Sequence, residues 1–261
     1  ESLQTEGYSL FIASSQHNQA KESRIVQTML EQRTDGVIIC SSSFSAQQGR
    51  QLLEGGFPVV VVNHQAAENF NYSIYHDDID GSRQVTQHLI GLGHRRIAYL
   101  GNSESGRTTL DRLNGYQSAL REAGLVLRDD YLYQVTGGDP SLGAASVAYY
   151  SGLAEPPSAI VCFNDTLAIG VLAGCRAAGL RVPDDLSVTG FDNIPFAAYT
   201  CPPLTTFDQP KYAIGAEAAA LLLNLLRDGD GKAPDTQEVQ ILKGRLLVRG
   251  STSLLSSASQ R

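Results

Sequence analysis

Short apolar runs that alternate with longer helical patterns are the feature of this sequence that most restricts its fold. Residues 58–62 and 159–163 are examples of such runs, and runs of this length without polar residues are typical of strands buried on both faces. Stretches such as 81–92 and 112–123 instead repeat their apolar residues at helical spacing. The alternation therefore predicts an α/β fold with mainly parallel sheets flanked by helices.

The number of these strand–helix units exceeds what one sheet comfortably holds, so we expect two Rossmann-like lobes in the 261 residues. The expected strands are 8–14, 36–40, 58–62, 72–75, 96–100, 131–135, 159–163 and 186–191. The expected helices are 21–32, 46–54, 81–92, 112–123, 142–152, 165–178 and 213–226.

Composition excludes several classes of function. The net charge is −7, so the chain has no overall basic surface for nucleic acid. No run approaches the roughly 18 apolar residues of a membrane span. The four cysteines have no metal-ligand spacing and are interpreted as buried free thiols of a reducing cytosol. We expect no metal, no cofactor and no membrane association.

Polar residues follow many of the expected strands at the point where each strand ends. Ligands of open parallel sheets bind beyond the carboxyl ends of the strands, so these positions are candidates for a binding site. Amide side chains donate and accept, carboxylates accept, and arginine donates, which together suits a neutral polyhydroxylated ligand. The residues concerned are Asn63, His76, Asp77, Asn102, Asn164, Asp165, Asp192 and Asn193.

Several of these residues also have a purely structural interpretation. Asp165 precedes a helical pattern and is expected to cap that helix, which leaves Asn164 to face a ligand. Asp192 and Asn193 could form an Asx turn, and His76 could be a histidine with internal partners. Arg112 is different, because a cation near a helix start is unfavourable and calls for an anionic or ligand partner.

Two further observations bear on function. Phe163 ends a buried run, and its ring belongs either to the core or to a flat apolar surface beneath a sugar. The sequence contains no nucleophile elbow, no Walker A loop, no complete dinucleotide-binding glycine motif and no zincin motif. We therefore expect a binding protein and not an enzyme.

Long motifs along nearly the whole chain resemble the LacI/GalR family of bacterial transcriptional repressors, specifically their effector-binding core. The motifs are TDGVII at 34–39, HLIGLGHRRI at 88–97, RLNGYQSAL at 112–120, GLRVPDDLSVTGFD at 179–192, PLTTFDQP at 203–210 and LLVRGST at 246–252.

This resemblance implies a periplasmic-binding-protein-like core of two lobes with three crossovers. By analogy the N-terminal lobe is 1–76 plus 205–234, the C-terminal lobe is 77–204 plus 235–255, and 256–261 is a tail. The helix-turn-helix, the hinge helix and the first core strand of the family are expected to be absent from this chain, with residues 1–8 the end of the helix that follows that strand.

The resemblance also implies a cytoplasmic homodimer that binds a small effector, commonly a sugar or nucleobase, between its lobes and contacts operator DNA through the absent N-terminal domain. Carried over by motif, the ligand-binding residues are Arg112, Asn164 and Asp192. His76 and Asn63 join them by position, His76 where the family usually has an aspartate or an aromatic residue and Asn63 where it often has an aspartate. Phe163 completes the expected set because of its place at the end of a strand. The alternative is an extracytoplasmic sugar-binding protein that serves an ABC transporter and has the same fold.

Overall fold

The computed structural model describes residues 2–15, 18–40, 52, 54, 56, 58–63, 72–227 and 238–255. The chain divides into two compact units. Unit 1 comprises Glu1–His76 and Pro210–Lys243, and unit 2 comprises Asp77–Gln209 and Gly244–Arg261. The backbone therefore passes between the units three times, as the predicted fold class requires.

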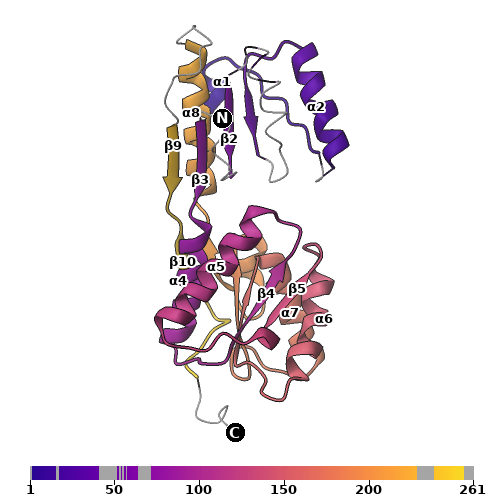
Figure 1. Ribbon diagram of the computed structural model, residues 1–261, viewed down its shortest axis with the longest axis vertical. Coiled ribbons are helices and arrows are strands. Elements are labelled where there is room, and N and C mark those ends of the chain that lie inside the picture. Colours follow the sequence, from indigo (N-terminus) through magenta and orange to yellow (C-terminus); the bar gives the residue numbers. More distant parts are fainter. Residues whose placement is uncertain are drawn as a thin grey trace. The chain divides into compact units, whose positions relative to one another are not determined.

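Unit 1 contains a parallel sheet whose strands occur in the order β1 (Val37–Ile39), β2 (Val59–Val62), β3 (Tyr72–His76) and β9 (Glu238–Leu242). The helices of this unit in the described part of the chain are α1 (Ser2–Thr5), α2 (Gln19–Glu31) and α8 (Lys211–Arg227). Figure 1 shows α8 alongside the strands, and it packs against β1, β2 and β3.

Strand β2 shows why this sheet is covered on both faces. Its four valines are all buried, and alternate side chains of a strand point to opposite faces. Val59 and Val61 pack in one apolar cluster with Val26 of α2. Val60 and Val62 pack in a second cluster with residues of α8.

Unit 2 contains a six-stranded sheet in which only β10 runs antiparallel to its neighbour. The order is β10 (Arg245–Leu247), β8 (Thr205–Asp208), β7 (Ser187–Phe191), β6 (Ala159–Cys162), β4 (Ile97–Asn102) and β5 (Leu132–Val135). The helices are α4 (Asp78–Gly91), α5 (Arg107–Glu122), α6 (Pro140–Ser151) and α7 (Asp165–Ala177), with short 3-10 turns η2 (Asp129–Tyr131) and η3 (Pro195–Tyr199).

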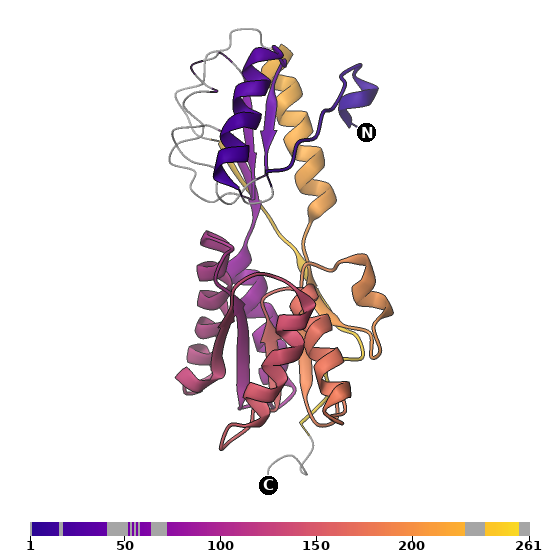
Figure 2. The same cartoon turned by 90° about the vertical axis from the view of Figure 1, so that its right-hand side faces the viewer.

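The helices of unit 2 lie on both sides of its sheet (Figure 2). On β4, Ile97 and Tyr99 pack in the cluster formed with α4 and α5. The alternate residues Ala98 and Leu100 pack in the cluster formed with α6 and α7. Both sheets are thus doubly covered, and the predicted α/β class is confirmed.

The expectation of a strand at residues 8–14 is wrong, because this segment is not part of either sheet. Phe11 is 82% exposed and Ile12 is 87% exposed. A strand requires a hydrogen-bonded neighbour, and in the described sheet β1 pairs only with β2. The expected helix at 46–54 falls largely outside the described residues, as does the tail 256–261.

Strands β8, β9 and β10 do not stand out as apolar runs, and pairing decides to which unit they belong. Strand β8 pairs with β7 and β10, so residues 205–209 lie in unit 2, whereas the family pattern placed them in the N-terminal lobe. Strand β9 pairs with β3, so residues 238–243 lie in unit 1. Among the helices in the described part of the chain, none has both the length and the hydropathy needed to cross a bilayer.

Candidate functional site

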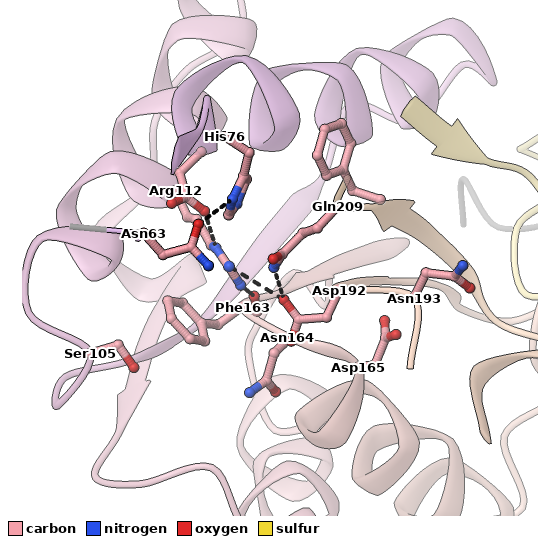
Figure 3. Close-up of polar contacts among 12 residues, drawn as sticks. Asn63, His76, Ser105, Arg112, Phe163, Asn164, Asp165, Asp192, Asn193 and Gln209 are labelled. Atoms are coloured by element: carbon pink, nitrogen blue, oxygen red, sulfur yellow. Dashed lines mark hydrogen bonds and ion pairs between the residues drawn. The ribbon is translucent and has the colours of Figure 1, made fainter. Parts of the chain in front are cut away.

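Arg112 lies at the centre of a buried polar cluster in unit 2 (Figure 3). It projects from α5 and is only 5% exposed. Its Nε donates to Oδ1 of Asp78 across 2.7 Å, and its Nη1 donates to the carbonyl oxygen of Phe163 across 2.6 Å. Its Nη2 lies 3.3 Å from Oδ1 of Asp192. One guanidinium therefore connects three separate segments of the unit.

Two aromatic rings and two carboxylates hold the charge of Arg112 in this buried position. Its Cζ lies 4.6 Å from the ring centroid of Phe163 and 3.8 Å from that of Phe191, within the range of cation–π attraction. Burial acts to lower the pKa of Arg112, but the charges of Asp78 and Asp192 outweigh burial and raise this pKa above its ordinary value. The guanidinium consequently stays charged.

Asp192 is more open to solvent than the two other charged groups of this cluster. Its side chain is 26% exposed, whereas the side chains of Arg112 and Asp78 are each 6% exposed. Gln209 donates from its Nε2 to Oδ1 of Asp192, the same oxygen that faces Arg112. Asp192 thus presents a positioned carboxylate with a cation behind it, an arrangement that can accept hydrogen bonds from hydroxyl groups.

The backbone at Asp192 is in an unusual conformation. Its φ is +112°, and the φ of the next residue, Asn193, is +49°. Positive φ is uncommon for residues other than glycine and costs about 1–3 kcal/mol at each position. The Asp192 amide N–H donates to the carbonyl of Phe207 across 2.9 Å, which ties this corner to β8.

The structure assigns the cap of α7 to Asn164 and not to Asp165. Asn164 is the N-cap of α7, and its Oδ1 accepts from the amide of Leu167 across 2.9 Å. Asp165 is the first residue of the helix and is fully buried. The prediction that Asp165 caps the helix is therefore wrong, because the cap must have extended dihedral angles, and Asn164 has them with φ −148° and ψ 172°.

Phe163 and Asn164 differ in how much of each side chain remains for contact with a ligand. Phe163 is 5% exposed and belongs to the apolar cluster of α6 and α7, with the guanidinium of Arg112 near its ring. Its carbonyl is the group bonded to Arg112. The cap occupies Oδ1 of Asn164, so the donor end of this amide is the end suited to a ligand oxygen.

His76 and Asn63 form a second polar cluster, which belongs to unit 1. Asn63 follows β2 with a φ of +55°, and His76 ends β3 and is 3% exposed. His76 Nδ1 lies 3.3 Å from Asn63 Oδ1, which is a hydrogen bond when Nδ1 carries the proton. The parallel pairing of β2 with β3 brings these two predicted residues together.

Two residues of the Arg112 cluster were absent from the predicted set. Asp78 directly follows Asp77, which was in the set of strand-end residues. A buried arginine needs a carboxylate partner, and Asp78 is the partner of Arg112 in this unit. Gln209 lies in the PLTTFDQP motif, but nothing in its type distinguishes it from a surface glutamine. Across the described residues, no group of three or more histidine, cysteine or acidic side chains is arranged to hold a metal.

Comparison with known proteins yields matches over most of the chain. Residues 86–252 match the family of periplasmic binding protein-like domains. The HTH-type transcriptional repressor CytR of Escherichia coli is 31% identical over 254 residues, which are 95% of this chain and 72% of CytR. The repressor PurR of Actinobacillus pleuropneumoniae is 32% identical over 225 residues, which are 85% of this chain and 66% of PurR. The chain spans about two thirds of the length of such curated relatives.

Among solved structures, a LacI family transcriptional regulator from Enterococcus faecium with bound ribose is similar throughout. It is 27% identical, the TM-score is 0.83, and the match covers 97% of this chain and 91% of that one.

Proposed function

This chain belongs to the LacI family of transcriptional regulators, and on that premise we propose that it is the sugar-sensing core of a repressor whose affinity for operator DNA depends on the sugar. The observation that carries the proposal is the Asp192 carboxylate, partly exposed and backed by the buried charge of Arg112.

The charges of the cluster favour a neutral ligand. Asp78 and Asp192 supply two negative charges against the single positive charge of Arg112, so an anionic ligand meets net repulsion. Hydroxyl groups donate to Asp192, and the terminal nitrogens of Arg112 offer N–H groups to sugar oxygens. The ribose in the Enterococcus faecium structure is a ligand of this chemical class.

Regulation follows from a ligand that prefers one arrangement of the core over another. We expect the repressor to act as a homodimer and to contact DNA through a domain outside this chain. The curated relatives compared above are repressors, which favours this function over that of a transporter's binding protein. The same relatives support a non-enzymatic role.

A ligand screen followed by titration tests the proposal. The melting temperature of the chain is measured with a panel of pentoses, hexoses, disaccharides and nucleosides, because a ligand of the folded state raises it. We expect at least one neutral sugar to do so. Isothermal titration calorimetry with that sugar is then expected to show roughly 10- to 100-fold weaker binding for Asp192→Asn, since a hydrogen bond to a charged group contributes about 1.5–3 kcal/mol.

The matched control for this test is Asp185→Asn. Asp185 is paired with Arg181 at the surface of the same unit, and its substitution is expected to leave sugar binding unchanged. A panel in which no sugar raises the melting temperature contradicts the proposal. Equal affinity of Asp192→Asn and the unchanged chain places the site elsewhere.

A further inference from the structure

The corner formed by Asp192 and Asn193 is held by side chains from three other segments of unit 2. These segments are the start of α7, strand β8 and the stretch after β10. Both corner residues have positive φ, a conformation that persists only where surrounding contacts enforce it. The contacts that enforce it are therefore candidates for a role in the site.

Asn193 is bound at both ends of its side-chain amide. Its Nδ2 donates to Oδ1 of Asp208 across 2.9 Å. Its Oδ1 accepts from Nη2 of Arg249 across 2.8 Å. Asparagine tolerates the left-handed backbone conformation. The two bonds to Asp208 and Arg249 in addition fix the rotamer of the Asn193 side chain.

Arg249 is itself fixed to β8 and the residue before it. Its Nη1 donates to the carbonyl of Leu204 across 2.7 Å, and its amide N–H donates to Oγ1 of Thr205 across 2.9 Å. The guanidinium thus bridges the strand and the Asn193 side chain. Its bond to Asn193 therefore links β8 to the residue that directly follows Asp192.

Asp165 holds the other side of the corner. Its Oδ2 accepts from the amide of Ile194 across 2.8 Å, and its Oδ1 accepts from Oγ1 of Thr206 across 2.5 Å. That hydroxyl oxygen also lies 3.4 Å from the amide of Asn193. The carboxylate requires glycine at position 190, because a Cβ there would lie 2.2 Å from Oδ1 of Asp165.

We propose that Asn193, Arg249 and Asp165 are positioning residues that hold the Asp192 carboxylate against Arg112 and Gln209 in the orientation that binds ligand. This inference rests on the proposed function for the role of Asp192. These three residues fix the backbone of residues 192–194. They thereby influence the affinity for ligand without contacting the ligand themselves.

The test observes Arg112 directly and requires no ligand. The side-chain Nε–H and Nη–H resonances of Arg112 are recorded by ¹⁵N NMR in the whole chain, with Asp192→Asn as the reference for loss of the ionic contact. Arg249→Met and Asn193→Gly are both expected to shift these resonances in the direction seen for Asp192→Asn. Asn193→Gly permits positive φ but removes the side-chain bonds to Arg249 and Asp208. It therefore tests the contact between Asn193 and Arg249 even if Arg249→Met does not fold.

Hydrogen exchange separates positioning from general stability. We expect the amides of Asp192 and Ile194 to exchange at least 10-fold faster in both variants, while the buried amide of Leu100 in β4 keeps its rate. Arg181→Met, a substitution at an exposed arginine, is expected to change neither readout. Unchanged Arg112 resonances in a folded variant overturn the proposal, and so does an equal acceleration of Leu100.

The two proposals fail in different ways. If no sugar binds the unchanged chain, the proposed function is wrong, whereas the resonances and exchange rates still decide whether these residues position Asp192.

Discussion

Arg112 and Asp78 form an ion pair in which Nε and Oδ1 are 2.7 Å apart and each side chain is 6% exposed. The pair joins α5 to the first turn of α4, directly after the chain enters unit 2 at Asp77. A buried pair of this kind adds little stability over an apolar pair, but removal of one partner leaves an uncompensated charge. Loss of Asp78 is therefore expected to lower the stability of unit 2 and to disturb Arg112, which lies beside the candidate ligand-binding residue Asp192.

Substitution of Asp78 by alanine is expected to lower the free energy of unfolding by about 3–5 kcal/mol, because Arg112 remains buried without its closest carboxylate. Urea denaturation followed by circular dichroism measures this loss. Asp185→Ala breaks an exposed pair with Arg181 and is expected to cost less than about 1 kcal/mol. Equal losses in the two variants would show that burial of the Asp78 pair has no energetic consequence.

The N-cap role of Asn164 can be separated from its predicted ligand contact. Asn164→Ala removes the oxygen bonded to the Leu167 amide and is expected to cost about 1 kcal/mol of stability. Asn164→Asp keeps a capping oxygen, so its stability is expected to stay near that of the unchanged chain, but it lacks the amide donor. If Asn164 binds ligand, Asn164→Asp weakens sugar binding in calorimetry. Sugar affinity that is unchanged in Asn164→Asp assigns the residue to the helix alone.

We expect His88 and His94 to make the stability of unit 2 depend on pH. Burial lowers the pKa of both histidines below the usual 6.5. His88 Nε2 contacts Thr252 Oγ1 at 3.0 Å, and His94 Nε2 contacts the Ser253 carbonyl at 3.1 Å. The unfolded chain binds protons more readily, so this stability is present above pH 6.5 and is lost as the pH falls from 6.5 through the folded pKa values.

Denaturation at pH values from 7.5 to 5 measures this dependence, which reaches at most about 1.4 kcal/mol per pH unit for each histidine. His88→Gln keeps a polar group near Thr252 but does not titrate, so a shallower decline is expected. A decline of the same steepness in this variant would mean that other groups cause it.

Substitution of glycine by alanine is expected to have opposite effects on stability at Gly190 in unit 2 and at Gly215 in unit 1. At Gly190 a Cβ would lie 2.2 Å from Asp165 Oδ1, so Gly190→Ala is expected to lower the free energy of unfolding by about 1–3 kcal/mol. At Gly215 in α8 a Cβ meets nothing within 4 Å, so Gly215→Ala is expected to raise it by about 0.5–1 kcal/mol. Thermal and urea denaturation of both variants provide the comparison.

The sequence predicts the covered sheets well because burial on both faces leaves a compositional signal. The valines of β2 and the apolar residues of β6 can be satisfied only where helices pack on each side. The segment 8–14 carries the same apolar signal without a strand partner. Strand β9 shows the reverse case, because its place is set by backbone pairing with β3 while its side chains are mostly exposed.

The polar residues of the candidate site could be predicted from the sequence, but the contacts that each of them makes could not. Three acids occur within four positions at the start of α4, and helix rotation alone distinguishes them. Asp77 caps the helix, Asp78 faces Arg112, and Asp80 bonds Arg83. A one-residue difference in the helix start likewise moves the cap of α7 from Asp165 to Asn164. Such one-residue differences lie below the precision of a pattern read from sequence.

The three passages of the backbone between the units also impose an order on synthesis. In unit 1 the face of the sheet that bears Val60 and Ile74 is covered by Ile214 and Leu222 of α8, yet all of residues 77–209 are translated in between. A nascent chain that has not yet reached α8 therefore exposes this apolar face while unit 2 is being made. Chaperone contacts on the ribosome are expected first at the strands of unit 1.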